Sequence, residues 1–189
     1  TYAVLLSGAH RLFALKHGAT IVTYSEAIMP SFPAGKQPHE IYPTIKGILR
    51  ADKYPNWNEF EWDVYKNMGN PRVSFVDVGK KLEVSWQTVK NHYDVIMKDA
   101  KVWLGFFPLG MNGYYHLFFS FETEYETGFK KELEKLDRTT FLFRGESKLF
   151  LFMYVENPQC LCRRFDELEK EGIVRDVRVS IPIQWHRTI

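Results

Sequence analysis

The chain has 189 residues, 45% of them hydrophobic and 16% aromatic, and its 25 Lys and Arg against 23 Asp and Glu give a formal net charge of +2 at pH 7. This length suffices for one sizeable core or two small ones. The near-neutral charge does not demand an acidic partner. No signal peptide is visible and no apolar run approaches the ~18 residues of a membrane span, so we expect a cytoplasmic protein with no membrane partner.

The first 33 residues predict a β-rich segment. Apolar residues alternate in the runs YAVLLSG, RLFALKHG and TIVTYSEAIMPSF, which Gly8 and Gly18 separate. Residues 34–55 are rich in Pro and Gly and predict a linker with little regular structure. The hydrophobic period then changes to helical, which places a domain boundary before residue 56.

Residues 56–105 predict three short helices. Ser74 is the predicted N-cap of the second helix, with Asp77 as its capping partner three residues later. A short joint at Glu83 follows, and Ser85 is the predicted N-cap of the third helix. Two capped helices separated by so short a joint predict a helix-turn-helix, and we expect a winged-helix-like DNA-binding domain.

The third helix has one apolar and one polar face. Four residues at helical spacing face the predicted core: Val89, Tyr93, Ile96 and Ala100. Its first turns present four candidate base-contacting side chains: Trp86, Gln87, Lys90 and Asn91. Gln and Asn can pair bidentately with adenine, and Lys can donate to guanine or phosphate, as in a recognition helix. The residues expected to hold phosphates are Thr88, Lys80, Lys81 and Arg72.

An ordinary solvated helix face is the alternative to this recognition helix. Residues 71–101 hold six Lys or Arg against four acids, which is a modest local charge for a segment that binds DNA. The predicted phosphate contacts are therefore few per subunit, and we expect affinity to depend on two subunits on a two-fold site.

Residues 106–189 predict a second domain in which strands and helices alternate. The expected elements are a strand at 114–122, a helix at 125–136, strands at 139–144 and 148–155, a helix at 159–172 and a strand at 175–185. This βαββαβ order is that of ferredoxin-like domains, so the expected fold class is α+β.

The central strands of this second domain are apolar on both faces. In KLFLFMYV, Leu149 and Leu151 alternate with Phe150 and Phe152, and helices can cover only one face of such a sheet. The other face would leave a large apolar patch on a monomer, so we expect a homo-oligomer, a dimer or higher, built through the sheet. The alternative is that the N-terminal β-rich segment covers this face within one chain.

A partial internal repeat connects the two ends of the chain. SGAHRLFAL at residues 7–15 resembles RGESKLFLF at 144–152, and IMPSF at 28–32 resembles SIPIQ at 180–184. We interpret residues 1–33 as the second half of a degenerate ferredoxin-like unit whose intervening helix is missing. Chance similarity between two hairpins is the alternative, because the shared pattern is short.

The run VDVGKKLEVSWQTVKNHYDVIMKDAKVW resembles the helix-turn-helix of the Lrp/AsnC (leucine-responsive, feast/famine) transcription regulators. The resemblance extends over residues 57–185, because a linking strand and a βαββαβ effector domain follow in that family too. It implies a sequence-specific transcription regulator that binds duplex DNA. Glu83 stands where the family often has Gly, which predicts a positive φ at a residue with a side chain.

The same resemblance implies a small-molecule effector near the hairpin FRGESK, where sheets or subunits meet. Arg144 and Lys148 are the candidate effector-binding residues, and their charge favours an anionic or neutral ligand. The family favours an Asp near the position of Lys148, so sensing of amino acids is not expected to carry over.

No catalytic pattern is present, and we expect neither enzymatic activity nor a cofactor. The histidines are scattered without metal spacing, and Cys160 and Cys162 form no zinc or redox motif. One alternative is an enzyme that resembles the sirohaem decarboxylases, with a tetrapyrrole pocket of His116, Arg144, Arg163 and Tyr154. The other is an RNA-binding module that displays Phe150, Phe152 and Tyr154 on its sheet.

Overall fold

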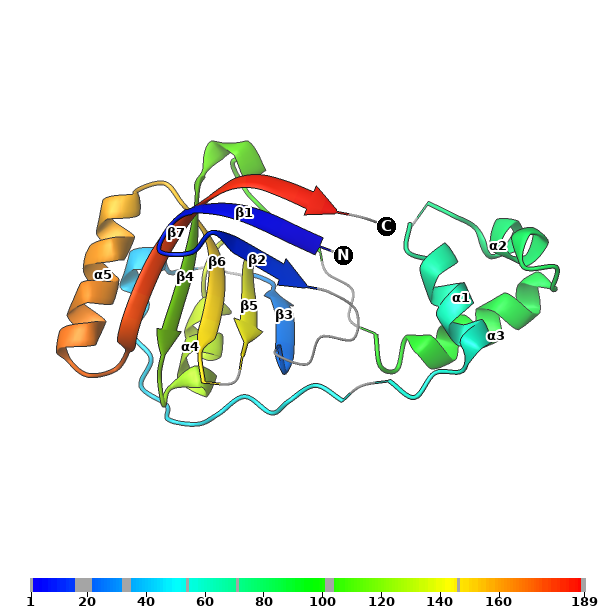
Figure 1. Cartoon of the computed structure of the whole chain (residues 1–189), viewed down its shortest axis with the longest axis horizontal. Helices are drawn as coiled ribbons and strands as arrows, with labels where there is room; N and C mark the ends of the chain where they lie inside the picture. The colour runs from blue at the N-terminus through cyan, green and yellow to red at the C-terminus, as the bar shows by residue number, and fades with distance from the viewer. Residues whose placement is uncertain are drawn as a thin grey trace. The chain divides into compact units, whose positions relative to one another are not determined.

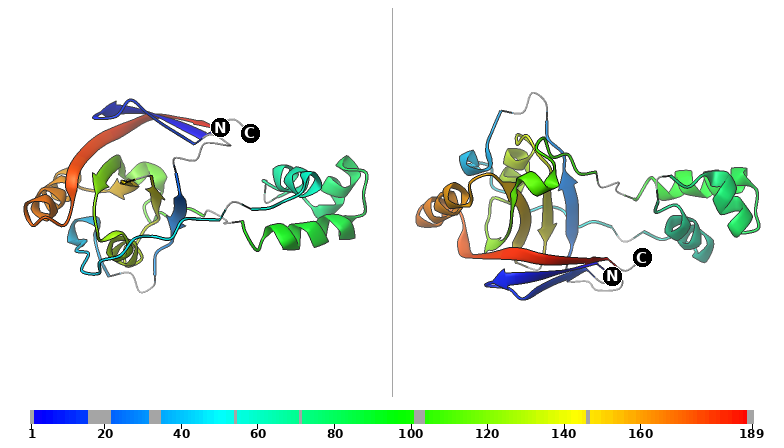
Figure 2. Two further views of the ribbon diagram at one scale, coloured as in Figure 1. Left: turned by 60° about the horizontal axis from the view of Figure 1, so that its bottom comes forward. Right: turned by 90° about the horizontal axis from the view of Figure 1, so that it is seen from above.

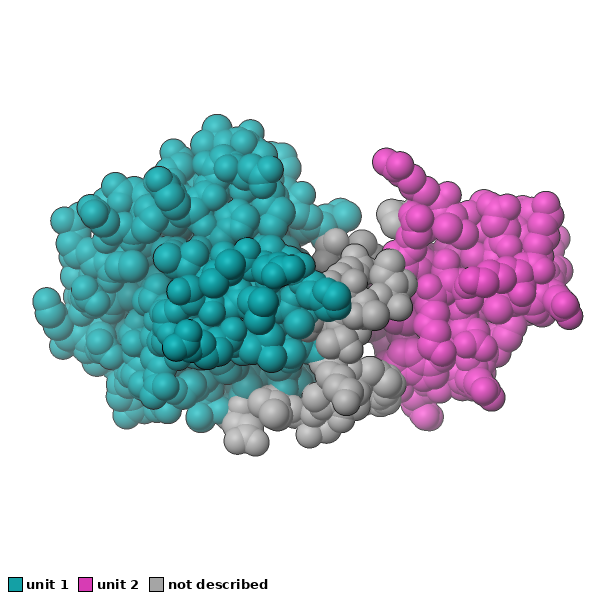
Figure 3. All heavy atoms as spheres, turned by 45° about the horizontal axis from the view of Figure 1, so that its top comes forward, with its two compact units in different colours: residues 1–52, 103–189 teal, residues 53–102 magenta. Residues whose placement is uncertain are grey.

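The computed structural model describes residues 2–15, 22–31, 35–53, 55–70, 72–100, 104–145 and 147–187. Gly18, Lys101 and the predicted boundary at residues 33 and 34 lie outside them. The fold is a mixed α+β structure that forms two compact units (Figure 3). Unit 1 comprises residues 1–52 and 103–189, and unit 2 comprises residues 53–102.

Seven antiparallel strands and two α-helices make up the regular structure described for unit 1 (Figure 1). The sheet has the order β2-β1-β7-β4-β6-β5-β3. In chain order the elements are β1 (Tyr2–Gly8), β2 (Leu12–Leu15), β3 (Tyr24–Ile28), β4 (Tyr115–Glu122), α4 (Glu126–Leu133), β5 (Thr140–Arg144), β6 (Leu149–Val155), α5 (Pro158–Lys170) and β7 (Arg175–Arg187), with 3₁₀ turns at Pro38–Glu40 and Met111–Gly113.

Helices α4 and α5 cover one face of the sheet (Figure 2). Their buried residues Phe129 and Phe165 pack against Phe119 and Phe121 of β4, and the rings of Phe119 and Phe165 stack at 4.3 Å. Because side chains alternate along a strand, every second residue of β4 and β6 points into this first core.

The β1–β2 hairpin and the distal part of β7, the residues from Ser180 to Arg187 that pair with β1, cover the opposite face (Figure 2). Val4 and Leu6 are buried there, and the ring of Phe13 lies 5.3 Å from both Phe118 and Phe152. The sequence left two alternatives for covering this face, and the structure has the one in which the N-terminal β-rich segment covers it within one chain. A second copy of the chain is therefore not needed to cover this face, contrary to the expectation from the sequence.

The segment predicted as a linker packs against the helical side of unit 1 as far as residue 52. As predicted, it has little regular structure, but Ile41 and Leu49 are buried in the first core. Gly128 donates its backbone N–H to the Ile45 carbonyl at 3.1 Å. A Cβ added to Gly128 would lie 2.7 Å from that carbonyl oxygen, so the close approach requires glycine.

Unit 2 contains the three predicted helices: α1 (Glu59–Asn67), α2 (Phe75–Lys81) and α3 (Trp86–Ile96). Their shared core is formed by four buried residues, Val64, Val78, Val89 and Ile96. Asn58 caps α1 and forms a capping box with Glu61, whose side chain accepts from the Asn58 N–H at 2.9 Å. Each helix is short, so tertiary packing around this core supplies most of its stability.

His10 connects the covering hairpin to the sheet. Its backbone N–H donates to Ser180 Oγ at 2.9 Å, and its ring nitrogens lie 3.0 Å from Ser180 Oγ and from Ser120 Oγ. Both serines are buried. Burial lowers the pKa of His10, and the nearby cations Arg178 and Lys148 lower it further, whereas Asp176 acts in the opposite direction.

We therefore expect the protein to lose stability as the pH falls below 6.5, the ordinary pKa of this side chain. The folded His10 binds a proton less readily than the same side chain in the unfolded chain, so protons favour the unfolded state. Urea unfolding at about pH 7.5 and 5.5 measures the loss. His10→Gln removes this titration and should reduce the loss, and an unchanged pH dependence would contradict the assignment.

Candidate nucleic-acid interface

A tight turn joins α2 to α3. Glu83 has a φ of 57°, which confirms the predicted positive φ at this residue. The Val84 N–H donates to the Gly79 carbonyl at 2.9 Å. A Cβ added to Gly79 would lie 2.8 Å from the Val84 carbonyl oxygen and 3.3 Å from the Trp86 nitrogen. The absence of a side chain at Gly79 therefore permits the close approach of the two helices.

Both predicted N-caps are present. Ser74 Oγ accepts from the Asp77 N–H at 3.1 Å, and its hydroxyl donates to the Asp77 carboxylate, which lowers the pKa of Asp77. Ser85 Oγ accepts from the Thr88 N–H at 3.1 Å and lies 2.9 Å from the Thr88 hydroxyl. These side chains satisfy backbone donors that would otherwise be free at the helix starts.

Helix α3 docks by its apolar face and exposes the predicted polar face. Val89 and Ile96 are buried in the core of unit 2. Trp86 is 47% exposed. The other predicted base-contacting residues are also exposed, namely Gln87, Lys90 and Asn91. The structure thus brings these four side chains together at the N-terminal half of one helix, and their contact with DNA remains a prediction.

The predicted phosphate-contacting residues lie on the elements around the turn. Lys80 and Lys81 end α2 and are exposed, as is Arg72 just before α2. Thr88 is half-buried, and its hydroxyl already pairs with Ser85 in the cap. Of the four, Thr88 is therefore the least available to a phosphate in this conformation.

An ion pair that the sequence interpretation missed crosses the polar face of α3. Lys90 Nζ lies 2.6 Å from Asp94 Oδ2, and both side chains are about half exposed. The signal was present in the sequence, since residues four apart on a helix are neighbours. The pair places a carboxylate on the face that would meet DNA and partly neutralises the cation there.

Helix α3 is also fixed against α1 at its middle. His92 Nδ1 lies 3.4 Å from Glu61 Oε1, and the rings of His92 and Phe60 pack edge to face at 4.8 Å. Glu61 is nearly buried and also completes the cap of α1. These contacts orient α3 relative to α1, and they sit on the half-buried side of the helix, away from Gln87 and Asn91.

Arg144, a predicted effector-binding residue, is held by side chains of unit 1. Its Nε donates to both carboxylate oxygens of Glu126, at 3.0 and 2.8 Å, and its Nη1 donates to Thr23 Oγ1 at 3.1 Å. Glu126 is buried and also accepts from the Leu49 N–H at 2.8 Å. Arg144 is thus a structural tie among β5, α4 and the packed segment, because a buried carboxylate needs such partners.

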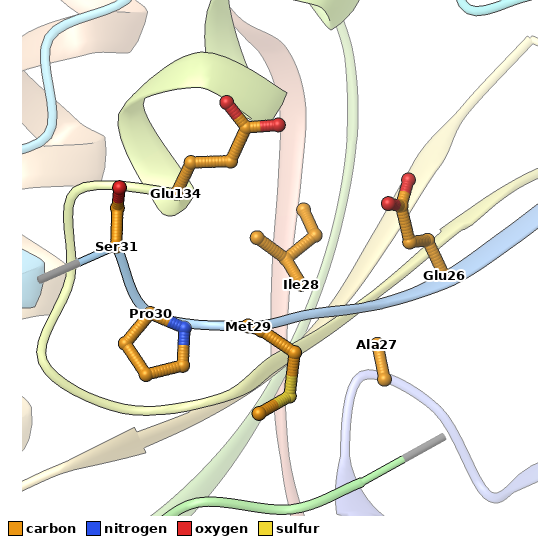
Figure 4. Close-up of a pocket in the computed structure, with 7 residues that line it drawn as sticks. All are labelled: Glu26, Ala27, Ile28, Met29, Pro30, Ser31 and Glu134. Atoms are coloured by element: carbon orange, nitrogen blue, oxygen red, sulfur yellow. The ribbon is translucent and has the colours of Figure 1, made fainter. Parts of the chain in front are cut away.

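Lys148 is engaged separately, in an ion pair with Asp176. A shallow pocket of about 330 Å³ lies beside β3, and neither Arg144 nor Lys148 lines it (Figure 4). The lining residues are Glu26, Ala27, Ile28, Met29, Pro30, Ser31 and Glu134. The two predicted effector-binding residues therefore have different partners, Glu126 for Arg144 and Asp176 for Lys148.

The two alternative sites are not assembled either. For the RNA-binding module, Phe152 and Tyr154 are buried, and Phe150 packs 5.9 Å from Phe13 of the covering hairpin. For the tetrapyrrole pocket, the rings of His116 and Tyr154 are neighbours at 4.8 Å, but Arg144 is held by Glu126 and Arg163 lies exposed on α5. The four residues do not converge.

Within the described ranges, no group of three or more His, Cys, Asp or Glu could hold a metal ion. None of the helices that the structure describes has the length and apolar content needed to cross a membrane.

No protein-family model matches the chain, and no curated protein matches it in sequence. Among solved structures, the crystal structure of PH0061 is similar with a TM-score of 0.46 and 12% identity, over 72% of this chain and 98% of that chain. An AsnC family transcriptional regulator from Agrobacterium tumefaciens is similar with a TM-score of 0.44 and 14% identity, over 70% of this chain and 92% of that chain.

The geometry of the turn predicts opposite effects for two substitutions. Glu83→Gly should stabilise unit 2 by roughly 0.5–1 kcal/mol, because glycine adopts a positive φ without strain. Gly79→Ala should destabilise it by roughly 1–3 kcal/mol, because the added methyl group has no room. Denaturant unfolding followed by tryptophan fluorescence measures both. Gly69→Ala is the matched control, since a Cβ there meets nothing closer than 3.5 Å, and equal effects of the two alanines would contradict the packing argument.

Proposed function

We propose that the protein is a sequence-specific DNA-binding transcription regulator of the Lrp/AsnC type, with α2, the turn and α3 as its helix-turn-helix. The observation that carries the proposal is the exposure of Trp86, Gln87, Lys90 and Asn91 on the first turns of a helix whose other face is buried. A helix held by a packed turn and an apolar face can present such side chains rigidly to the major groove.

The chemistry of the exposed face suits base edges. Gln87 and Asn91 are four residues apart and therefore adjacent on the helix surface, and each amide can both donate to and accept from adenine. Lys90 can donate to guanine once it leaves Asp94, and the exposed indole of Trp86 offers an apolar contact for a thymine methyl group. Lys80, Lys81 and Arg72 supply phosphate contacts from the neighbouring segment.

Unit 1 is, in this proposal, the ferredoxin-like effector domain. The support is the element order β4-α4-β5-β6-α5-β7 together with the strand order β7-β4-β6-β5. Reciprocal strand pairing supports the proposed N-terminal half-repeat: β1 pairs with β7, and β3 pairs with β5. A small-molecule effector remains a prediction, without Arg144 or Lys148 as an assigned ligand.

Replacing a base-contacting residue should change DNA binding in a different way from replacing a phosphate-contacting residue. Gln87→Ala or Asn91→Ala should cost ~1–3 kcal/mol at the preferred site and little on random duplexes. Lys80→Ala should weaken binding to all duplexes about equally and lower the salt slope by about 1.

A genomic selection with the purified protein supplies the preferred site, and fluorescence anisotropy measures the affinities. Lys66→Ala is the matched control, because Lys66 is an exposed lysine of the same unit on α1, outside the proposed face. The proposal is wrong if the selection enriches no sequence and Gln87→Ala binds every duplex as the wild type does.

The Lys90–Asp94 pair predicts a variant that binds DNA more tightly. Asp94→Asn removes a charge that repels phosphates and frees Lys90, whereas breaking an exposed pair costs little stability. We expect roughly two- to fivefold tighter binding to all duplexes and a steeper salt dependence. Asp63→Asn is the control, because it breaks the similarly exposed Lys66–Asp63 pair on α1. Equal affinities of the two variants would place α3 away from the DNA.

A further inference from the structure

The layer that covers the second face of the sheet has an outer face of its own. Three strands form it, β1, β2 and the distal part of β7, and the views of Figure 2 show no other element of unit 1 outside them. Four large aliphatic side chains are exposed there: Leu5 (49%), Leu12 (56%), Ile181 (57%) and Ile183 (66%). Leu5 lies directly opposite Leu12 in the strand register, so these side chains adjoin.

This outer face departs from the pattern expected of a face that meets water. A half-exposed antiparallel layer alternates apolar side chains inward with polar ones outward. Here Val4, Leu6 and Phe13 point inward, yet the outward positions are largely apolar as well. Helix α5 of the same unit, by contrast, exposes only polar side chains: Gln159, Arg163, Asp166, Glu169 and Lys170.

We propose that the outer face of this layer, defined by Leu5, Leu12, Ile181 and Ile183, is a self-association surface that binds the same face of a second copy of this chain. The exposed residues described on β1 and β2, and those on β7 from Ile181 to His186, include no Asp, Glu, Lys or Arg, and His186 is the one titratable side chain among them. A different protein partner is usually selected by complementary charges, which this face does not offer. A two-fold related copy needs only a self-complementary patch, and apolar residues facing apolar residues meet that condition.

The size of the face sets the strength of the association. β1 has seven residues, the part of β7 that pairs with it is about as long, and β2 has four. At about 4.8 Å between strands and about 3.3 Å per residue, the face covers roughly 250–300 Å². A stable dimer interface buries about 800 Å² per partner, so this contact belongs to the weak class. We therefore expect a dimer that forms reversibly as the concentration rises. Its interface differs from the one expected from the sequence, because that expectation concerned the sheet face that the β1–β2 hairpin buries.

Sedimentation of the full chain without DNA, from about 1 μM to several hundred μM, tests the proposal independently of DNA binding. The wild type should shift from a 22.3 kDa monomer toward twice that mass as concentration rises. Ile183→Glu should raise the dissociation constant at least tenfold, because each copy would bury a charge. Ile48→Glu should leave it unchanged, since Ile48 is equally exposed, at 66%, but lies on the packed segment.

Leu12→Glu on β2 is the second test variant. It replaces Ile183→Glu if circular dichroism shows that Ile183→Glu does not fold. A wild type that stays monomeric over the whole range overturns the proposal, whether the face is free or covered by something else. So does an association that both glutamate variants retain. Loss of association in the Ile48→Glu control would place the interface on the other side of unit 1 and would likewise overturn it.

Discussion

Both faces of the two central strands of unit 1 are apolar, and this constraint determines the arrangement of the elements around them. Along β4, Phe119 points to the helices and Phe118 to the covering hairpin, and along β6 Leu151 and Phe152 divide in the same way. Burying each such side chain contributes about 1.5–3 kcal/mol, so neither face can remain in water. Helices α4 and α5 protect one face, and β1, β2 and distal β7 protect the other, which completes the core within one chain.

The cover also explains how the ends of unit 1 are held together. β1 pairs with β7, the last strand, and β3 pairs with β5 at the opposite edge. The strands that precede unit 2 in the sequence therefore pair with both edges of the group of strands that follows unit 2. The half-buried His10 and its partners, the buried Ser120 and Ser180, fix the hairpin within an otherwise apolar interface. Buried polar groups of this kind require partners, and their geometry selects one placement of the cover.

Short-range features were predictable from the sequence, and long-range ones were not. The caps at Ser74 and Ser85 and the positive φ of Glu83 depend on residues within a few positions, and the structure contains all three. The strand and helix order of residues 106–189 followed from periodicity in the same way. The tie between Arg144 and Glu126 joins groups whose spacing carries no local signal, so the sequence did not predict that a buried carboxylate holds Arg144.

The weak charge of unit 2 limits what electrostatics can contribute to the proposed recognition of DNA. Two of the carboxylates near the helix pair are engaged, Asp94 with Lys90 and Asp77 with Ser74, and both remain on the surface. Non-specific affinity comes mainly from phosphate neutralisation, so a surface with few free cations binds random DNA poorly. In the proposed function, discrimination between sequences would then rest on the amides of Gln87 and Asn91, because their base contacts would supply a larger share of a smaller total binding free energy. A second copy joined through the outer face of the covering layer would double the phosphate contacts without changing the reading of either half-site, which is how a nearly neutral chain can gain affinity and keep its selectivity.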